Sequence, residues 1–306
     1  MEGFLISEHL LRKLIDMRNI FFCFLVLVTS ITHCQTIKGI IKDSISEETI
    51  PYVNIVLLQG GGTYSNEKGE FTLKVKENKP DTLMVSILGY SSIKLPIQPS
   101  RIEDEILLDL LLTPKTETLD EVIVVSKKKK YNKKIRLGEH KNGNIGVTSL
   151  IGYETCILIT NPKKEKGKIK KVFIDLKRRK NADFTAIFNI KFYSYNQEND
   201  SPGELLYTKN IYVKPKNRKY RFWINVNELD IPFPENAVCI GVEMINGSGH
   251  VKKYTKFGPM FRYTITKSKT KVWSNYHNTG WKNANINRKN NKIETAVPII
   301  GIEALF

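Results

Sequence analysis

Short segments rich in β-branched and aromatic residues recur along most of the chain, and turn residues separate them. In one of these segments the apolar residues Phe188, Ile190 and Phe192 occupy every second position. The polar residues Asn189 and Lys191 stand between them. A period of two is typical of a β-strand that packs one face on a core and turns the other to solvent. Because helical patterns are nearly absent, we expect an all-β fold.

The distribution of charge divides the chain in two. Residues 36–126 carry 9 Lys and Arg against 14 Asp and Glu, whereas residues 127–306 carry 36 against 14. The sign changes within Leu119–Lys130, where an apolar run leads into four lysines. A length of 306 residues also favours two domains. We expect an acidic domain at 36–126, a basic linker at 127–149 and a basic domain at 150–306.

Regular short strands predict an antiparallel β-sandwich for the acidic domain. The strands are expected at residues 36–42, 51–58, 63–75 (two strands and a turn), 82–88, 90–97, 106–112 and 121–125. Gly69 and Gly89 fit turn positions that need a positive φ. Both are fold residues rather than site residues.

Several segments of this domain resemble a known family. They are Ile40-Ile-Lys-Asp43, Ile50-Pro-Tyr-Val-Asn-Ile55, Gly62-Thr-Tyr-Ser-Asn-Glu-Lys-Gly-Glu-Phe71 and Ile87-Leu-Gly-Tyr90, in that order. The succession resembles the carboxypeptidase-regulatory-like domain and spans most of residues 36–126. The resemblance implies a transthyretin-like Greek-key sandwich, common on exported proteins of Bacteroidetes.

The basic domain shows eight or nine further strand-like segments, with a long polar turn at residues 196–204. This pattern predicts a jelly-roll-like sandwich. The segments at residues 190–195, 201–206, 222–226, 231–235 and 242–244 resemble an uncharacterised β-sandwich that often follows the regulatory-like domain. They are also similar, more loosely, to carbohydrate-binding jelly rolls.

Residues 1–35 predict export. Arg18 precedes the apolar run Ile20–Val28, and a polar segment follows it, which is the layout of a secretory signal. Met17 is the better start, so we interpret residues 1–16 as an upstream misassigned start; the alternative is a longer N-terminal region of the signal. The expected location is the periplasm, the outer membrane as an associated protein, or the cell surface. Cys34 leaves lipidation open, although His33 stands where lipoproteins have a small residue.

The apolar half of the charge boundary, Leu119–Val125, also resembles the join in large outer-membrane receptors that carry this domain ahead of a plug and barrel. The residues that follow are too few for a plug and a barrel of about 22 strands. We therefore expect neither transport nor an integral membrane protein. Docking to an outer-membrane protein partner stays open.

The inventory of catalytic motifs argues against an enzyme. His140, His250 and His277 are not followed by a glutamate at metal-binding spacing, and no serine nucleophile motif occurs. We interpret each histidine as a surface residue and expect no metal or cofactor. Glycoside hydrolysis by two carboxylates remains the enzymatic alternative, because any two acids can meet in space. Glu198 and Asp200 of the polar turn offer oxygens for calcium, but without EF-hand spacing.

The segment from Trp273 to Trp281 is the candidate ligand site. Its residues Trp273, Asn275, Tyr276, Asn278 and Trp281 combine aromatic rings with amides, a pattern that suits sugar faces and hydroxyls. The alternative is that one tryptophan fills the core and the other covers an edge.

The sequence thus predicts a non-enzymatic, exported cell-envelope protein with a binding or structural role. Its expected ligand is a glycan or an anionic envelope polymer, because a basic surface attracts polyanions. Nucleic acid is not expected in that compartment. Cys156 and Cys239 stand in apolar strands, where a disulfide and two buried thiols are both open.

Overall fold

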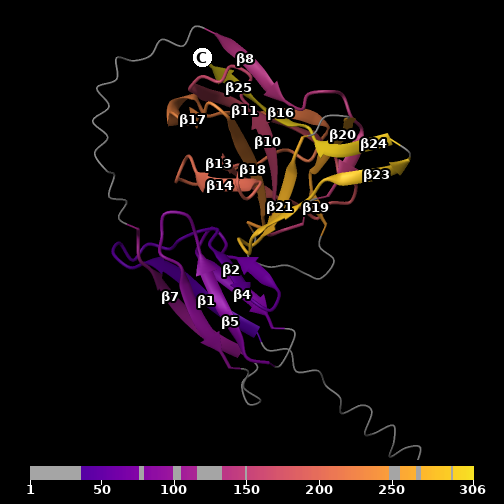
Figure 1. The fold of residues 1–306 in the computed structure, drawn as a ribbon. Coiled ribbons are helices and arrows are strands. Elements are labelled where there is room, and N and C mark those ends of the chain that lie inside the picture. The colour runs from indigo at the N-terminus through magenta and orange to yellow at the C-terminus, as the bar shows by residue number, and fades with distance from the viewer. Residues whose placement is uncertain are drawn as a thin grey trace, which may run out of the picture.

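Two β-sandwiches, one after the other along the chain, make up the protein (Figure 1). The computed structural model describes residues 36–75, 79–98, 105–115, 133–148, 150–247, 256–266, 270–290 and 292–306. The expected signal segment, the strand at 121–125 and the lysine run at 127–130 lie outside these residues. No helix in the described part of the chain has the length and apolar character needed to cross a membrane.

Within the described residues, the first sandwich shows seven strands in two sheets. One sheet has the order β4 (Glu70–Lys74), β1 (Thr36–Asp43), β7 (Glu105–Leu112), and the other has the order β3 (Gly62–Tyr64), β2 (Asn54–Leu57), β5 (Asp81–Ser86), β6 (Ile93–Ile97). The core between the sheets is aliphatic apart from Phe71. Gly69 and Gly89 adopt φ of 76° and 89°, as their turn positions predicted.

One pairing in this sandwich differs from the antiparallel expectation. Strands β1 and β7 run parallel, with Thr36 opposite Glu105 and Asp43 opposite Leu112. Between β1 and β7 the chain forms β4 and the strands of the other sheet. It then returns to pair β7 with β1, on the side away from β4 and in the same direction as β1. A parallel pair needs such a long crossover, and local patterns do not reveal it.

The second sandwich packs a seven-stranded sheet against a nine-stranded sheet. The seven-stranded sheet has the order β14 (Ser201–Leu205), β13 (Ile187–Asn196), β18 (Ala237–Ile245), β10 (Tyr153–Thr160), β21 (Val272–Tyr276), β22 (Trp281–Asn283), with β15 (Tyr212–Val213) on β13. The nine-stranded sheet has the order β23 (Ile286–Asn290), β24 (Lys292–Pro298), β20 (Met260–Thr266), β11 (Gly167–Lys177), β25 (Ile300–Leu305), β8 (Lys134–Gly138). To it are added β9 (Ile145–Val147) on β20, and β16 (Tyr220–Asn225) and β17 (Pro232–Phe233) on β11. A parallel pair, β12 (Phe184–Thr185) and β19 (Phe257–Gly258), and a 3-10 turn, η1 (Asn227–Leu229), complete the described elements.

The structure moves two expected boundaries. Strands β8 and β9 lie inside the range 127–149 that was read as linker, and they pair with β25 and β20 of the second sandwich. The polar turn expected over 196–204 is shorter, because β14 already begins at Ser201 and pairs back on β13. For β8 and β9, hydrogen bonding to strands distant in sequence overrides a polar composition, whereas β14 forms a hairpin with the preceding strand β13.

A larger correction concerns the polar face of β13. Phe188, Ile190 and Phe192 lie in the core between the two sheets, as their spacing predicted. Asn189 and Lys191, expected in water, are buried as well: Asn189 is 2% exposed, and the Lys191 side chain is 12% exposed. This face is covered because the first sandwich packs on it, as the placement of β2 below β13 and β18 in Figure 1 shows.

Candidate functional site

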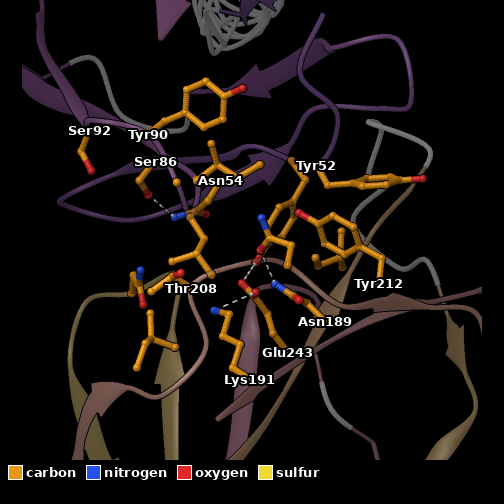
Figure 2. A pocket seen from close by; sticks show the side chains of 18 of the residues that line it. Tyr52, Asn54, Ser86, Tyr90, Ser92, Asn189, Lys191, Thr208, Tyr212 and Glu243 are labelled. Atoms are coloured by element: carbon orange, nitrogen blue, oxygen red, sulfur yellow. Dashed lines mark hydrogen bonds and ion pairs between the residues drawn. The ribbon is translucent and has the colours of Figure 1, made fainter. Parts of the chain in front are cut away.

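A cavity of about 380 Å³ lies between the two sandwiches. Each sandwich supplies half of its lining residues, and Figure 2 shows Tyr90, Asn54 and Ser86 facing Lys191 and Glu243 across it. The aromatic lining comes from Tyr52, Tyr64, Tyr90, Tyr193 and Tyr212. The volume falls in the range of small-molecule sites, about 300–1,000 Å³.

A buried charged network forms the floor of the cavity on the side of the second sandwich. Lys191 Nζ on β13 lies 3.0 Å from Glu154 Oε2 on β10 and 3.0 Å from Glu243 Oε2 on β18. The Tyr193 hydroxyl donates to Glu154 Oε2 at 3.1 Å. From the first sandwich, the Tyr64 hydroxyl donates to Glu243 Oε1 at 2.6 Å. One hydrogen bond of this network therefore joins the two sandwiches.

Strand register brings these groups together. Glu154 and Glu243 stand directly opposite each other on β10 and β18, and Lys191 is opposite Gly241 on the next strand. A Cβ at Gly241 would collide with the Glu154 carboxylate, so glycine leaves the space that this carboxylate fills. The other carboxylate oxygen of Glu154, Oε1, is buried without a hydrogen-bond partner among the described residues.

Burial and pairing set the protonation of the network. Burial disfavours the charge of Lys191, but the two carboxylates outweigh it and raise the pKa above its ordinary value. Burial also opposes the charge of Glu243, yet Lys191 and the Tyr64 hydroxyl lower the pKa of this carboxyl. For Glu154 burial prevails over Lys191 and raises the pKa. Lys191 is therefore held as a cation between the ionised carboxylate of Glu243 and the carboxyl of Glu154, which takes up a proton more readily.

His277 closes the interface beside the network, where the sequence indicated a surface histidine. Its side chain is 2% exposed and stacks on Tyr64 at 5.1 Å between ring centroids. Its Nδ1 donates to Asn54 Oδ1, and its backbone carbonyl accepts from Asn54 Nδ2 at 3.2 Å. Desolvation lowers the pKa of His277 to about 4, against the opposing attraction of Glu243.

Two glycines make room for this imidazole. A Cβ on Gly62 of the first sandwich would lie 2.8 Å from His277 Nε2, and a Cβ on Gly152 of the second would collide with the same atom. Because the ring is enclosed from both sides, His277 acts as a neutral wedge between the domains. Exposed His140 agrees with the surface interpretation, and His250 lies outside the described residues.

The mouth of the cavity carries exposed polar groups. Ser92, Lys115, Thr208 and Asn278 are exposed and line the cavity. Within the described ranges, the side chains of Ser92, Lys115 and Asn278 make no hydrogen bond or ion pair. A hydroxyl, an ammonium and an amide therefore stand at the entrance above the tyrosine-lined interior.

The segment predicted as a ligand site divides between two places. Trp273 is 4% exposed and packs with Cys156, Tyr193 and Cys239, and its Nε1 donates to the Asp200 carbonyl at 3.1 Å. Trp281 covers the same cluster, 5.4 Å from Tyr193 between ring centroids. The Trp273 ring therefore has little face left for a sugar.

The amides and the tyrosine of that segment have other surroundings. Asn275 is buried and accepts from the Gly280 amide at 3.1 Å. Tyr276 packs between Tyr153 and His277. Of the five predicted residues, Asn278 lines the cavity between the sandwiches.

The two cysteines and the acidic residue considered for calcium also have defined surroundings in the structure. Cys156 and Cys239 are free, buried thiols, and the pKa of Cys156 is raised well above its ordinary value by burial and by Cys239 beside it. Asp200, considered for calcium, pairs with Lys271 at 2.6 Å. The described residues hold no cluster of His, Cys, Asp and Glu suited to a metal ion.

Sequence reasoning missed Lys191, Glu154 and Glu243. Each is a single charged residue inside an otherwise apolar strand: Glu154 in Ile-Gly-Tyr-Glu-Thr-Cys-Ile, Lys191 in Asn-Ile-Lys-Phe-Tyr and Glu243 in Gly-Val-Glu-Met-Ile. Isolated charges of both signs in neighbouring apolar strands are a signal for a buried ion network, since a buried charge needs a partner.

Comparison with known proteins gives a match for the first sandwich. A family model described as "CarboxypepD_reg-like domain" matches residues 37–124. The TonB-dependent receptor SusC of Bacteroides thetaiotaomicron is 33% identical over 90 residues, which are 29% of this chain and 8% of the receptor. The chain therefore matches only a small part of that relative.

Solved structures give weaker likenesses. A DUF3823 family protein and a proposed carbohydrate-binding protein, both from Bacteroides uniformis, are 10% and 11% identical, with TM-scores of 0.23 and 0.21. The comparison covers 87% and 88% of this chain and 99% and 98% of theirs. Scores this low support no inference about function.

Proposed function

We propose, from the CarboxypepD_reg-like domain that residues 37–124 form, that this chain is a non-enzymatic binding protein of the bacterial cell envelope. Its site is the cavity between the sandwiches, and its ligand is a polyhydroxylated one, a glycan unit. The observation that carries the proposal is the cavity lining, in which five tyrosine rings surround amide and hydroxyl groups from both domains.

The lining suits a sugar for chemical reasons. Aromatic rings offer flat apolar faces to the C–H side of a pyranose, while amides and hydroxyls satisfy its hydroxyl groups. Four of the five tyrosine hydroxyls already donate to carboxylates, namely those of Tyr52, Tyr64, Tyr90 and Tyr193. Tyr64 and Tyr193 are buried, so the ring faces open to a ligand are those of the half-buried Tyr52, Tyr90 and Tyr212. Hydrogen bonds to the ligand come from the amides and from the groups at the mouth.

Blocking the mouth tests this proposal. Ser91 and Ser92 are adjacent and exposed, but only Ser92 lines the cavity. A glycan array followed by calorimetry on the full chain should identify a ligand that binds wild type and Ser91→Trp equally and fails to bind Ser92→Trp. Equal binding to all three proteins would place the glycan elsewhere, and binding of no glycan would contradict the proposal.

Hydrolysis is the rival function, and the network argues against it. Glu154 and Glu243 form an acid pair, but Lys191 bridges both carboxylates and Glu154 is not among the residues that line the cavity. A glycosidase needs both acids at the bond that breaks. We expect the protein to release no new reducing ends from any glycan that it binds. If wild type released reducing ends and Glu243→Gln did not, the protein would be an enzyme instead.

A second candidate function is docking to an outer-membrane protein. The similarity to part of the receptor SusC supports it, together with Leu107 and Leu111, which are 76% and 56% exposed on the edge strand β7. Exposed leucines on a sheet edge favour contact with another protein. If so, a defined outer-membrane receptor should co-purify with wild type and not with Leu107→Asp/Leu111→Asp, whereas equal recovery would argue against docking through β7.

A further inference from the structure

The nine-stranded sheet turns a basic and aromatic surface away from the first sandwich. Strands β8, β25, β11 and β16 lie side by side on the far side of the second sandwich (Figure 1). Residues directly opposite each other share a face of a sheet. Register therefore aligns Arg136, Glu303, Lys171 and Asn225 in one row, and Phe173 and Trp223 in the next.

Aromatic and guanidinium side chains packed on one another build this surface. Trp223 is half-buried and lies 5.1 Å from Phe173 between ring centroids. The Arg136 guanidinium lies 5.1 Å from the Trp223 ring centre, and that of Arg221 lies 4.4 Å from the Phe173 ring centre. Cation–π contacts of this kind hold a guanidinium flat while leaving its N–H groups available. We call the residues Lys134, Arg136, Lys171, Arg221 and Trp223 the basic face.

Glycine lets the Phe173 ring pack closely against the sheet. A Cβ on Gly301, which is opposite Phe173 on β25, would collide with the Phe173 ring. The ring therefore rests directly on the β25 backbone and is fully buried under its neighbours. Trp223 packs against this fixed ring at an interplanar angle of 54°, with the Arg136 guanidinium over its own ring, so the half-buried indole is held in place at the surface.

The acids of this region are covered or already neutralised. Asp175 is 2% exposed and is bound by Arg221 at 2.5 and 3.1 Å and by Arg262 at 3.3 Å. The Glu303 side chain is 8% exposed and lies 3.6 Å from Lys134 Nζ. In the described part of the chain, Arg136 and Lys171 pair with no carboxylate. The accessible charge of the basic face is therefore positive.

We propose that the basic face is a second binding site, separate from the cavity, and that it binds an acidic polysaccharide. Arg136 and Lys171 bind the carboxylate, sulfate or phosphate groups of successive sugar units, and Trp223 contacts a sugar ring. Two cations that pair with no carboxylate among the described residues, a supported aromatic ring and covered acids together fit a polymer that is both anionic and flat-faced. Nucleic acid shares this chemistry in part, but the expected export gives envelope glycans access to the face.

The test measures binding of polygalacturonate to the full chain by calorimetry and by tryptophan fluorescence, at low and at physiological salt. The double variant Arg136→Gln/Lys171→Gln should bind about tenfold more weakly, because the charge contacts of exposed Arg136 and half-buried Lys171 are lost. The control Lys38→Gln/Lys94→Gln removes the same charge from exposed positions on the first sandwich and should bind within about twofold of wild type. Binding should weaken with salt, since exposed charges are screened over about 10 Å at 0.1 M.

Trp223→Phe keeps a ring over Phe173, so it should fold, retain most of the binding and lose the fluorescence change. Equal losses in the two double variants would overturn the proposal, because net charge alone would then explain binding. Equal binding of neutral dextran, tighter binding of a single-stranded DNA oligonucleotide, or no binding of polygalacturonate at low salt would overturn it as well.

Discussion

Replacing Lys191 by methionine tests the buried network most directly. The substitution keeps much of the side-chain volume and removes the cation between Glu154 and Glu243, each 3.0 Å from its Nζ. Removing one partner of a buried ion pair costs about 3–5 kcal/mol of unfolding free energy, because it leaves an uncompensated charge. Here it leaves two carboxylates directly opposite each other on adjacent strands.

The repulsion between these carboxylates gives a second measure of the cost. Opposite residues on adjacent antiparallel strands lie about 5 Å apart at Cβ. Two unit charges at this separation repel by about 3 kcal/mol at an effective dielectric constant of about 20. The pair relieves the repulsion by binding a proton, so both pKa values rise in the variant. Both routes therefore predict a loss of about 3–5 kcal/mol at pH 7.

The loss should depend on pH, with a definite sign. In wild type the lowered pKa of Glu243 contributes stability above the unfolded value, about 4.3, and that stability is lost as pH falls through the folded pKa. In Lys191→Met the raised carboxyl pKa values reverse the sign, so the variant loses stability as pH rises from about 4.3 to 7. The difference between the two proteins should therefore be small at pH 4 and largest at pH 7.

Urea denaturation followed by tryptophan fluorescence, at pH 4 and at pH 7, measures this difference. The control is Lys38→Met, which removes the cation of an ion pair with Glu105 whose side chains are 47% and 42% exposed. Exposed pairs contribute about 0–1 kcal/mol, so this control should stay close to wild type at both pH values. A Lys191→Met loss that is equal at pH 4 and pH 7, or no larger than the control's, would refute the reasoning.

Three further predictions concern the interface and the thiols. Tyr64→Phe removes the 2.6 Å hydrogen bond to Glu243 and should cost about 1.5–3 kcal/mol in urea denaturation, as bonds to charged groups do; a loss below 0.5 kcal/mol would mean that the bond is unimportant. The depressed pKa of His277, about 4, means that wild type loses stability as pH falls from about 6.5 to 4. His277→Gln should flatten this part of the pH profile, and an unchanged slope would assign the slope to other groups. Cys156 and Cys239 should resist alkylation in the native protein and both react in urea, as mass spectrometry can measure; rapid native labelling would contradict their burial.

Much of the architecture could be predicted from the sequence, because strand patterns are local. The alternation of Phe188, Ile190 and Phe192 identifies the core face of β13, and the glycines Gly69 and Gly89 identify turns. These signals need only neighbouring residues and the steric limits of the backbone. They also explain the error in the linker: β8 and β9 lie in a polar segment, and only pairing with the distant strands β25 and β20 makes them part of a sheet.

The site could not be predicted in the same way, because long-range packing decides which polar residues are buried. Tyr64 and Glu243 are 179 positions apart, and Asn54 and His277 are 223 positions apart, yet each pair is joined by hydrogen bonds. The isolated charge of Lys191 in an apolar strand signals a charged partner, but the residues near it do not show which partner it meets or that a second domain covers this face. The sequence by itself therefore determined the all-β class, the two modules and the regulatory-like domain. Only the tertiary structure decided that a buried ion network and a tyrosine-lined cavity lie where the modules meet, since desolvation depends on what packs above a face and not on the face alone.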